Sequence, residues 1–193
     1  MSTKTSKTSR GNTEPLSGFD YYVGKDENYK AVVVSKAEYD ALSPEKREDI
    51  KPAFGITEGN PTYELTDAQM QTFYAVVAAE AAANYDDALG VASVALNIVE
   101  TEKKGKDLFA DVIANKNVFE AYGGSNYNKY MTNPNSIPEC IINAVDDAIK
   151  GGVRNTACNT FRSNESISFS NNMITSDGNR YAVYSSNREL YKL

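Results

Sequence analysis

One stretch of this chain, residues 89–99, constrains the fold more than any other. It reads LGVASVALNIV and carries no charged residue. A helix that is apolar nearly all round is central and buried, so other elements must cover it on every side. We therefore expect a helix over about residues 87–103 at the centre of a globular domain. Lys103, Lys104 and the glycine Gly105 provide the positive charge and the flexible residue that close such a helix.

A second helix is predicted just before it, over about residues 66–83. Thr66 and Gln69 have the spacing of a capping box, and the alanine-rich segment that follows favours a helix. The apolar residues Met70 and Phe73 lie at helical spacing and begin a buried stripe. The two longest predicted helices are therefore consecutive in the chain.

The rest of the main domain reads as shorter helices followed by strands. The predicted elements are a short helix at 107–114, a polar loop at 115–135, a helix from a capping box at 136–139 to Gly151-Gly152, strands at 160–163, 166–170 and 180–185, and a hairpin turn at 176–178. Helices followed by a small β region indicate an α+β fold that is mainly helical.

The N-terminal third differs from the main domain in composition and in its predicted elements. Residues 1–18 are rich in Ser, Thr, Gly and Pro and are expected to be a disordered tail. Residues 19–60 predict a small module: a β-prone run at 30–34, helical turns opened by Ser35 and by Ser43-Pro44, and a linker at 54–61. It is too small to be stable alone, so we expect it to pack on the main domain, residues 61–193, or on a partner.

Composition excludes several kinds of chemistry. The chain has no histidine, which excludes Ser-His-Asp catalysis and nearly every catalytic zinc site. We therefore expect no metal or cofactor. Carboxylates are the candidate acids and bases. A net charge of -6 argues against nucleic-acid binding, and no apolar run suits a membrane span. Cys140 and Cys158 either form a disulfide or are two free thiols.

Glu80 is the carboxylate whose position is most unusual. It lies seven residues after Phe73 and three after Val77, on the apolar stripe and near the helix C-terminus. Burial and the helix dipole both disfavour its anion, and a glutamic acid that stays protonated can protonate a glycosidic oxygen. The alternative is a structural glutamate that lies at the helix edge or pairs with an arginine such as Arg162.

Residues 76–100, VVAAEAAANYDDALGVASVALNIVE, resemble the core motif of the SleB-like cell-wall hydrolases, the spore-cortex-lytic enzyme family. In that family a glutamate ends one helix, a short loop follows, and a helix of small residues ends in a Leu-Asn pair; here these are Glu80 and Leu96-Asn97. The resemblance covers about residues 66–186. The segment 117–130 occupies the place of the family's aromatic, glycine-rich loop, and 136–152 resembles the helix after it. The segment 160–163 resembles the strand that faces the cleft, and 178–184 corresponds to the closing strand.

The resemblance implies a lysozyme-like fold and cleavage of the β-1,4 bond between N-acetylmuramic acid and N-acetylglucosamine in peptidoglycan. Several members of the family are lytic transglycosylases, in which one glutamate protonates the leaving oxygen and then acts as base on the 6-hydroxyl of the sugar, closing a 1,6-anhydro ring. It thus implies that Glu80 is the general acid and base.

The chain departs from the family pattern around this glutamate. The family commonly has Gly-Glu-Ala-x-Gly-Glu, whereas Ala79 precedes Glu80 here, Asn84 stands at the later place, and the loop is one residue shorter. Asp86 and Asp87 are therefore candidates for a second carboxylate that activates water, which would make the enzyme a hydrolase. The alternative for both aspartates is helix capping.

Aromatic and glycine residues supply the candidate substrate site. Tyrosine offers a flat apolar face with a polar tip, and glycine lets the backbone approach a sugar closely. The candidates are Tyr122, Gly123, Gly124, Tyr127, Tyr130, Phe161, Arg162 and Ser163. The alternatives are that the tyrosines pack the loop on the core, that Phe161 packs beneath the site, and that Arg162 pairs with a structural acid. Asn97 is expected to be a structural hydrogen-bonding residue.

The leading hypothesis is an enzyme that cleaves peptidoglycan glycan strands. A catalytically inactive wall-binding or structural module on the same scaffold, and a glucosaminidase that cuts the other glycan linkage, are the alternatives. The N-terminus has no apolar segment typical of a secretory signal. We therefore expect delivery to the bacterial cell wall by a phage virion or tail-like particle, docked through residues 1–60, or release by a holin.

Overall fold

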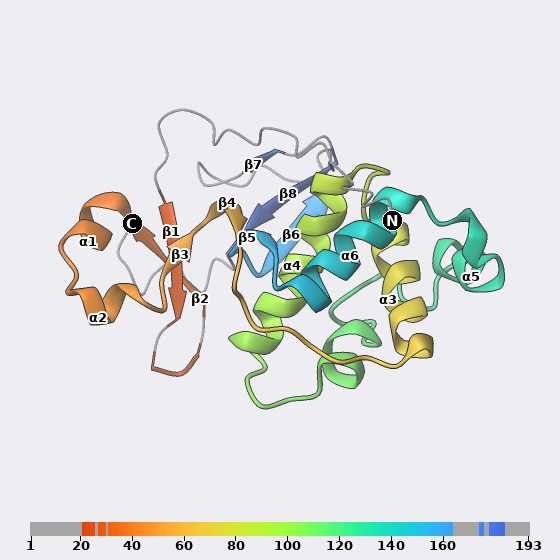
Figure 1. Cartoon of the computed structure of the whole chain (residues 1–193), viewed down its shortest axis with the longest axis horizontal. Helices are drawn as coiled ribbons and strands as arrows, with labels where there is room; N and C mark the ends of the chain where they lie inside the picture. Colours follow the sequence, from red (N-terminus) through yellow and green to blue (C-terminus); the bar gives the residue numbers. More distant parts are fainter. Residues whose placement is uncertain (1–20, 26, 30, 164–173, 176–177, 184–193) are drawn as a thin grey trace, which may run out of the picture.

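The computed structural model describes residues 21–25, 27–29, 31–163, 174–175 and 178–183. Its centre is the helix α4, Tyr85–Glu100, in which every residue from Asp87 to Val99 is buried. Figure 1 shows α4 between the strands and the other long helices. The prediction of a central apolar helix is confirmed, although α4 ends at Glu100 and Gly105 lies five residues beyond its end.

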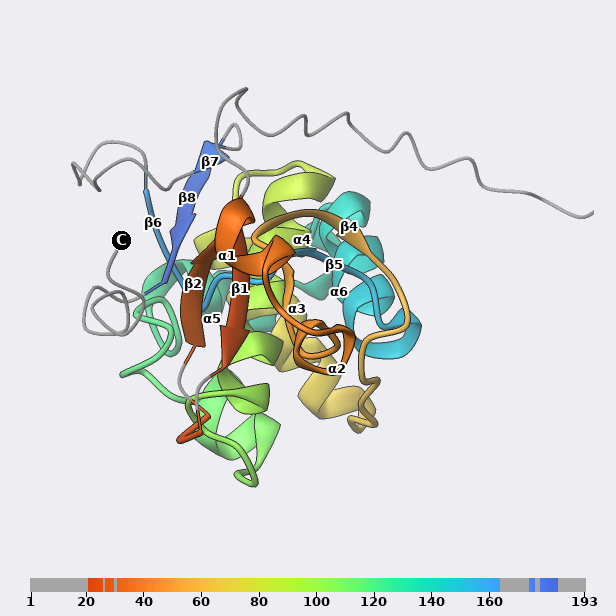
Figure 2. The ribbon, with the colours of Figure 1, turned by 90° about the vertical axis from the view of Figure 1, so that its left-hand side faces the viewer.

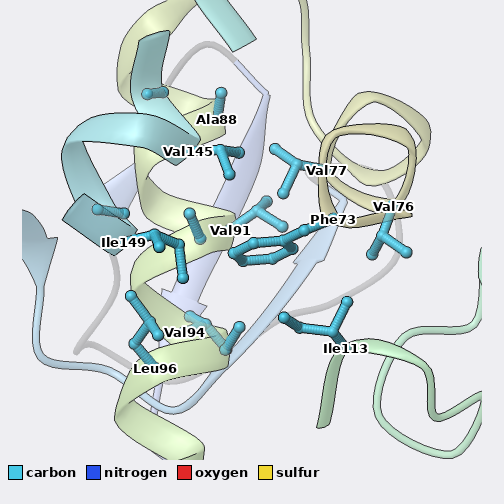
Figure 3. Close-up of a cluster of buried hydrophobic side chains, with 14 of the residues drawn as sticks. Phe73, Val76, Val77, Ala88, Val91, Val94, Leu96, Ile113, Val145 and Ile149 are labelled. Carbon is cyan, nitrogen blue, oxygen red and sulfur yellow. The ribbon is translucent and has the colours of Figure 1, made fainter. Parts of the chain in front are cut away.

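Two further helices cover α4 and complete the core. They are α3, Asp67–Glu80, which opens on the predicted capping box of Thr66 and Gln69, and α6, Glu139–Gly151, which ends at Gly152 in the left-handed conformation, φ 62°. Figure 3 shows Phe73 of α3 directed at α4, with Val145 and Ile149 reaching the same cluster from α6.

The connection from α4 to α6 is more helical than expected. It holds a π-helical turn, η1, Leu108–Ile113, then the helix α5, Ser125–Thr132, and a 3-10 turn, η2, Pro134–Ser136. The prediction of a loop over 115–135 is therefore wrong, because α5 forms from polar residues and buries none of them completely. The predicted capping box at 136–139 is also wrong: Pro138 precedes α6, and no side chain caps it.

The strands of the main domain follow α6. They are β5, Arg154–Thr156; β6, Thr160–Ser163; β7, Ile174–Thr175; and β8, Asn179–Ala182. The last three form an antiparallel sheet in the order β6-β8-β7, in which Phe161 is opposite Tyr181. The strand predicted at 160–163 is confirmed, while the one at 166–170 and most of the turn at 176–178 lie outside the described residues.

The N-terminal module is a small three-stranded sheet with two helical turns. Its elements are β1, Tyr21–Lys25; β2, Ala31–Ser35; α1, Lys36–Asp40; α2, Pro44–Arg47; and β3, Lys51–Pro52. Ser35 and Glu38 form both halves of a capping box, and Pro44 is the first residue of α2, as expected. Figure 2 shows this module in front of the helices.

The module packs on the main domain. The segment predicted as a linker contains the strand β4, Phe54–Thr57, which pairs with β5, and Ala53 accepts hydrogen bonds from Thr156 and Ala157 at 2.8 and 3.1 Å. The buried guanidinium of Arg154 donates to the carbonyl of Pro61 at 3.0 Å, to that of Ala148 at 2.7 Å and to Glu100 at 3.2 Å. Secondary-structure pairing therefore holds the two parts together, and Arg154 fixes the segment that follows the module to α4 and α6.

The fold is α+β and mainly helical, as the sequence predicted. Within the described ranges, no helix has the length and apolar character that a membrane crossing requires.

Gly90 of α4 provides a test of this packing. A Cβ atom at residue 90 would lie 2.4 Å from the ring of Tyr181 in β8, whereas a Cβ atom at Gly151, the last residue of α6, would lie 3.4 Å from its nearest neighbour, Val153. Because overpacking a filled core is destabilising, we expect Gly90→Ala to lower the free energy of unfolding by about 1–3 kcal/mol, measured by urea denaturation.

The matched control is Gly151→Ala, for which we expect an unchanged or slightly higher stability because alanine favours helix. Equal stability of the two variants would contradict the close approach of β8 to α4.

Candidate functional site

A cavity of about 390 Å³ opens at the C-terminal end of α3. Three parts of the chain that are far apart in sequence surround it: the ends of α3 and α4, the segment 117–120, and the paired strands β6 and β8. Its lining residues are Ala79, Glu80, Val94, Ile98, Asn117, Val118, Phe119, Glu120, Asn159, Thr160, Phe161, Arg162 and Asn179. The cavity therefore combines the predicted catalytic glutamate with the strand expected to face a cleft.

Glu80 is the last residue of α3 and lies on the cavity wall, half-buried. Its Oε1 accepts a hydrogen bond of 2.8 Å from the backbone N–H of Ala121, and its own carbonyl oxygen accepts one of 2.9 Å from the side-chain amide of Asn179. The backbone at Ala121 thus binds the side-chain carboxyl group of Glu80, and Asn179 of β8 binds the C-terminal end of α3.

The surroundings of Glu80 favour its protonated form. Burial is the largest influence and raises the pKa above its ordinary value, and the negative charge of Glu120 raises it further. The hydrogen bond from Ala121 and the positive charge of Arg162 act in the opposite direction. Burial prevails, so Glu80 retains its proton to a higher pH than an exposed glutamate does.

Phe161 and Arg162 of β6 both line the cavity and have different roles. Phe161 is half-buried, with its ring centroid 6.1 Å from those of both Phe119 and Tyr181, and it forms part of the cavity floor. Arg162 is exposed at the cavity, and among the described residues no carboxylate forms an ion pair with it. Its guanidinium is therefore available to a ligand. Ser163, at the end of β6, is opposite Asn179 in the sheet.

Asp87 is the most deeply buried acidic residue near the site, with no exposed surface. Its Oδ1 accepts from the hydroxyl of Tyr181 at 2.6 Å and the backbone N–H of Asn179 at 3.0 Å. Its Oδ2 accepts from the backbone N–H of Ala82 at 2.7 Å and the side chain of Asn179 at 3.0 Å. This carboxylate joins α4, β8 and the residues after α3, and its surface is closed to a substrate.

Neither aspartate caps α4 with its side chain. The N-cap is Asn84, whose side chain accepts from the backbone N–H of Asp87 at 2.8 Å. Asp86 is half-buried in the first turn, and its carbonyl accepts from Asn155 at 2.7 Å. Neither Asp86 nor Asp87 is among the residues that line the Glu80 cavity.

The predicted sugar-binding tyrosines lie outside the cavity lining. The rings of Tyr122 and Tyr127 contact each other with centroids 5.1 Å apart, and both, with Tyr130, pack partly buried against the core. Gly123 has a φ of 75°, and Gly124 precedes α5 as its N-cap. This arrangement favours the structural interpretation of the tyrosines, which pack the loop on the core.

Asn97 has the structural role expected of it. Its side-chain amide donates to the carbonyls of Thr156 and Cys158 at 2.9 and 2.7 Å, which fixes the connection from β5 to β6 beside α4. Cys140 and Cys158 are both free, and burial raises the pKa of the Cys158 thiol. The two cysteines therefore form no disulfide.

Glu120 and Asn179 are among the polar residues of the site that sequence reasoning missed. Glu120 could have been found, because it lies in the segment 117–130, which was expected to supply residues that bind the sugar. Asn179 could not, since its importance comes from contacts with residues about ninety positions earlier in the chain.

A second cavity, also of about 390 Å³, lies between the N-terminal module and the main domain. Lys25, Lys51, Tyr63, Glu100 and Lys104 are among the residues that line it, and burial lowers the pKa of Lys51. None of the predicted catalytic or substrate-binding residues is in its lining, so we take the Glu80 cavity as the candidate site.

Within the described ranges, no group of three or more His, Cys, Asp or Glu side chains converges in a way that could hold a metal ion. Comparison of the chain with models of protein families, with curated proteins and with solved structures finds no match.

Substitutions of Asp87 and of its donor Tyr181 are expected to lower the free energy of unfolding. Asp87→Asn removes the charge that four donors surround and turns one acceptor into a donor, so we expect the free energy of unfolding to fall by about 2–4 kcal/mol. Tyr181→Phe removes a single donor and should cost about 1–2 kcal/mol. Urea denaturation measures both, and an Asp87→Asn protein as stable as wild type would contradict the role of this carboxylate.

The raised pKa of Glu80 is expected to make the stability of the fold depend on pH. Because its pKa is raised in the folded state above the ordinary value of 4.5, its stabilising contribution is complete at low pH and is lost as pH rises through the folded-state pKa. Glutamine can still accept the bond from Ala121 but never becomes an anion. Thermal unfolding from pH 4 to pH 8 should therefore show wild type losing stability relative to Glu80→Gln, and a constant difference would contradict the raised pKa.

Proposed function

We propose that this protein cleaves the glycan strands of peptidoglycan between N-acetylmuramic acid and N-acetylglucosamine, with Glu80 as general acid and base. The observation that carries the proposal is the position of Glu80: a half-buried carboxyl group with a raised pKa on the wall of an open cavity. A carboxylic acid that keeps its proton near neutral pH is what protonation of a glycosidic oxygen requires.

The proposed substrate class rests on the sequence resemblance to the SleB-like hydrolases. Polar groups from several segments line the cavity beside Glu80, including Asn117, Asn159 and Thr160, and amides and hydroxyls of this kind can hydrogen-bond to a sugar. Phe161 supplies an apolar surface, and Arg162 is a suitable partner for the lactyl or peptide carboxylate of a muramic acid residue. A lysozyme-like fold is part of the same proposal.

We further propose that the reaction is a lytic transglycosylation. Glu80 donates its proton to the leaving oxygen as the bond from that oxygen to C1 breaks. The 6-hydroxyl of the muramic acid residue then attacks C1 and returns its proton to Glu80, which closes the 1,6-anhydro ring. This route needs one carboxyl group that transfers protons.

The burial of Asp87 favours this route over hydrolysis with Asp87 as the base. Asp87 has no exposed surface and accepts four hydrogen bonds from residues that the structure describes, so a water molecule has no access to it. Asp86 is outside the cavity lining as well.

The proposal predicts the effect of Glu80→Gln. We expect this variant to lose lysis of purified peptidoglycan by about 100-fold or more, because the acid that protonates the leaving oxygen is gone. A turbidity assay and a zymogram measure the loss, and an unchanged circular dichroism spectrum shows that the fold is kept. Glu64→Gln, which neutralises an exposed glutamate before α3, is the matched control and should lyse normally.

Equal lysis by Glu80→Gln and wild type would contradict the role of Glu80. A wild-type protein that binds peptidoglycan but lyses none of several wall types would instead favour a wall-binding module. Activity at the bacterial cell wall, with delivery by a phage particle or through a holin, belongs to the same proposal.

A further inference from the structure

Glu120 is an exposed carboxylate on the wall of the Glu80 cavity, and the proposed reaction gives it no role. Its carbonyl carbon is bonded to the amide nitrogen of Ala121, the atom that donates to Glu80 at 2.8 Å. The backbone of Glu120 is therefore held directly against the Glu80 carboxyl group. Among the residues that the structure describes, the ionisable side chains that line this cavity are Glu80, Glu120 and Arg162.

We propose that Glu120 is a second functional carboxylate of this cavity, whose negative charge stabilises both the proton on Glu80 and the positive charge that a sugar ring acquires as its glycosidic bond breaks. The inference rests on the proposed glycan cleavage and assigns a role to a residue that neither the motif nor the reaction route required.

Glu120 acts on Glu80 through its charge. Two negative charges at one cavity repel each other, so the charge of Glu120 makes ionisation of Glu80 less favourable. Arg162, on the strand β6, favours the anion of Glu80 instead. The cavity thus holds one acidic and one basic side chain that act on Glu80 in opposite directions.

Other charged groups near the end of α3 do not line this cavity. Asp86 and Asp87 lie on α4, and Arg180 lies on β8. Asp87 is linked to the end of α3 through Asn179, whose side-chain amide donates both to Asp87 and to the carbonyl of Glu80. Glu120 and Arg162 are therefore the charged neighbours that Glu80 shares with a ligand in the cavity.

The charge of Glu120 also acts on the sugar. As the bond from C1 to the leaving oxygen breaks, positive charge develops on C1 and the ring oxygen. A fixed negative charge stabilises this state more than it stabilises the neutral substrate, which lowers the barrier. Glu120 forms no bond to the sugar and transfers no proton in this scheme, because the 6-hydroxyl attacks C1 and Glu80 receives its proton.

The direct test is the titration of Glu80, followed by carbon NMR of its carboxyl group. The variants are Glu120→Gln, Arg162→Gln and the exposed control Glu64→Gln. We expect the midpoint to be lower than in wild type in Glu120→Gln, higher in Arg162→Gln and unchanged in Glu64→Gln. This pattern of opposite shifts does not follow from a general loss of structure.

Kinetics on purified peptidoglycan give the second readout. Glu120→Gln should lower kcat by roughly 10–100-fold with little change in KM, and move the alkaline limb of the pH profile to lower pH. Glu120→Asp should recover part of the loss, since it restores the charge. Arg162→Gln should move the same limb to higher pH.

A Glu80 midpoint that is the same in Glu120→Gln and wild type overturns the inference, and so does a Glu120→Gln enzyme with the kcat of wild type. In the second case lysis by wild type and its loss in Glu80→Gln leave the proposed function standing. A wild-type protein that cleaves no glycan contradicts the proposed function, and the NMR titration then still decides whether Glu120 acts on Glu80.

Discussion

The buried carboxylate of Asp87 is the interaction on which the arrangement of the site depends. A charge with no exposed surface is costly unless donors surround it, and here two backbone N–H groups, one amide and one phenol do so. Those donors come from Ala82, Asn179 and Tyr181, so satisfying one charge forces β8 against α4 and the end of α3. Gly90 allows this approach, because any side chain there would meet the ring of Tyr181.

The position of β8 also determines the position of Glu80. Asn179 donates to Asp87 and to the carbonyl of Glu80 with the same amide, which ties the last turn of α3 to the sheet. On the other side, the N–H of Ala121 holds the Glu80 side chain. Two carboxylates seven residues apart thus have different roles: Asp87 is buried and structural, whereas Glu80 accepts a hydrogen bond from Ala121 and lies at an open cavity.

Periodicity predicted the parts of this fold that depend on local rules. The apolar run of α4, the capping boxes of Thr66 and Ser35, the glycine after α6 and the strand β6 all follow from a few neighbouring residues. The helix α5 was missed because its sequence is polar and lacks a buried stripe. The strand β4 was read as a linker because its pairing partner, β5, lies about a hundred residues away.

The same distinction holds for the candidate site. The position of Glu80 on an apolar stripe marked it before any contact was known, and the segment 160–163 was expected at the same cleft. Of the two interpretations of the tyrosines, sugar binding and packing of the loop on the core, the structure favours the second, because Tyr122 and Tyr127 pack against each other and the core. Long-range contacts, such as those of Asn179 and Arg154, leave no local pattern in a single sequence.

The central claim is that one protonated carboxyl group, Glu80, cleaves a glycan strand without a water nucleophile. Mass spectrometry of the fragments that wild type releases from purified peptidoglycan tests it most directly. The account predicts muramic acid ends in the 1,6-anhydro form, each lighter by one water molecule than a hydrolytic product, and none with Glu80→Gln. Reducing ends that carry oxygen from labelled water, on N-acetylmuramic acid or on N-acetylglucosamine, would contradict it.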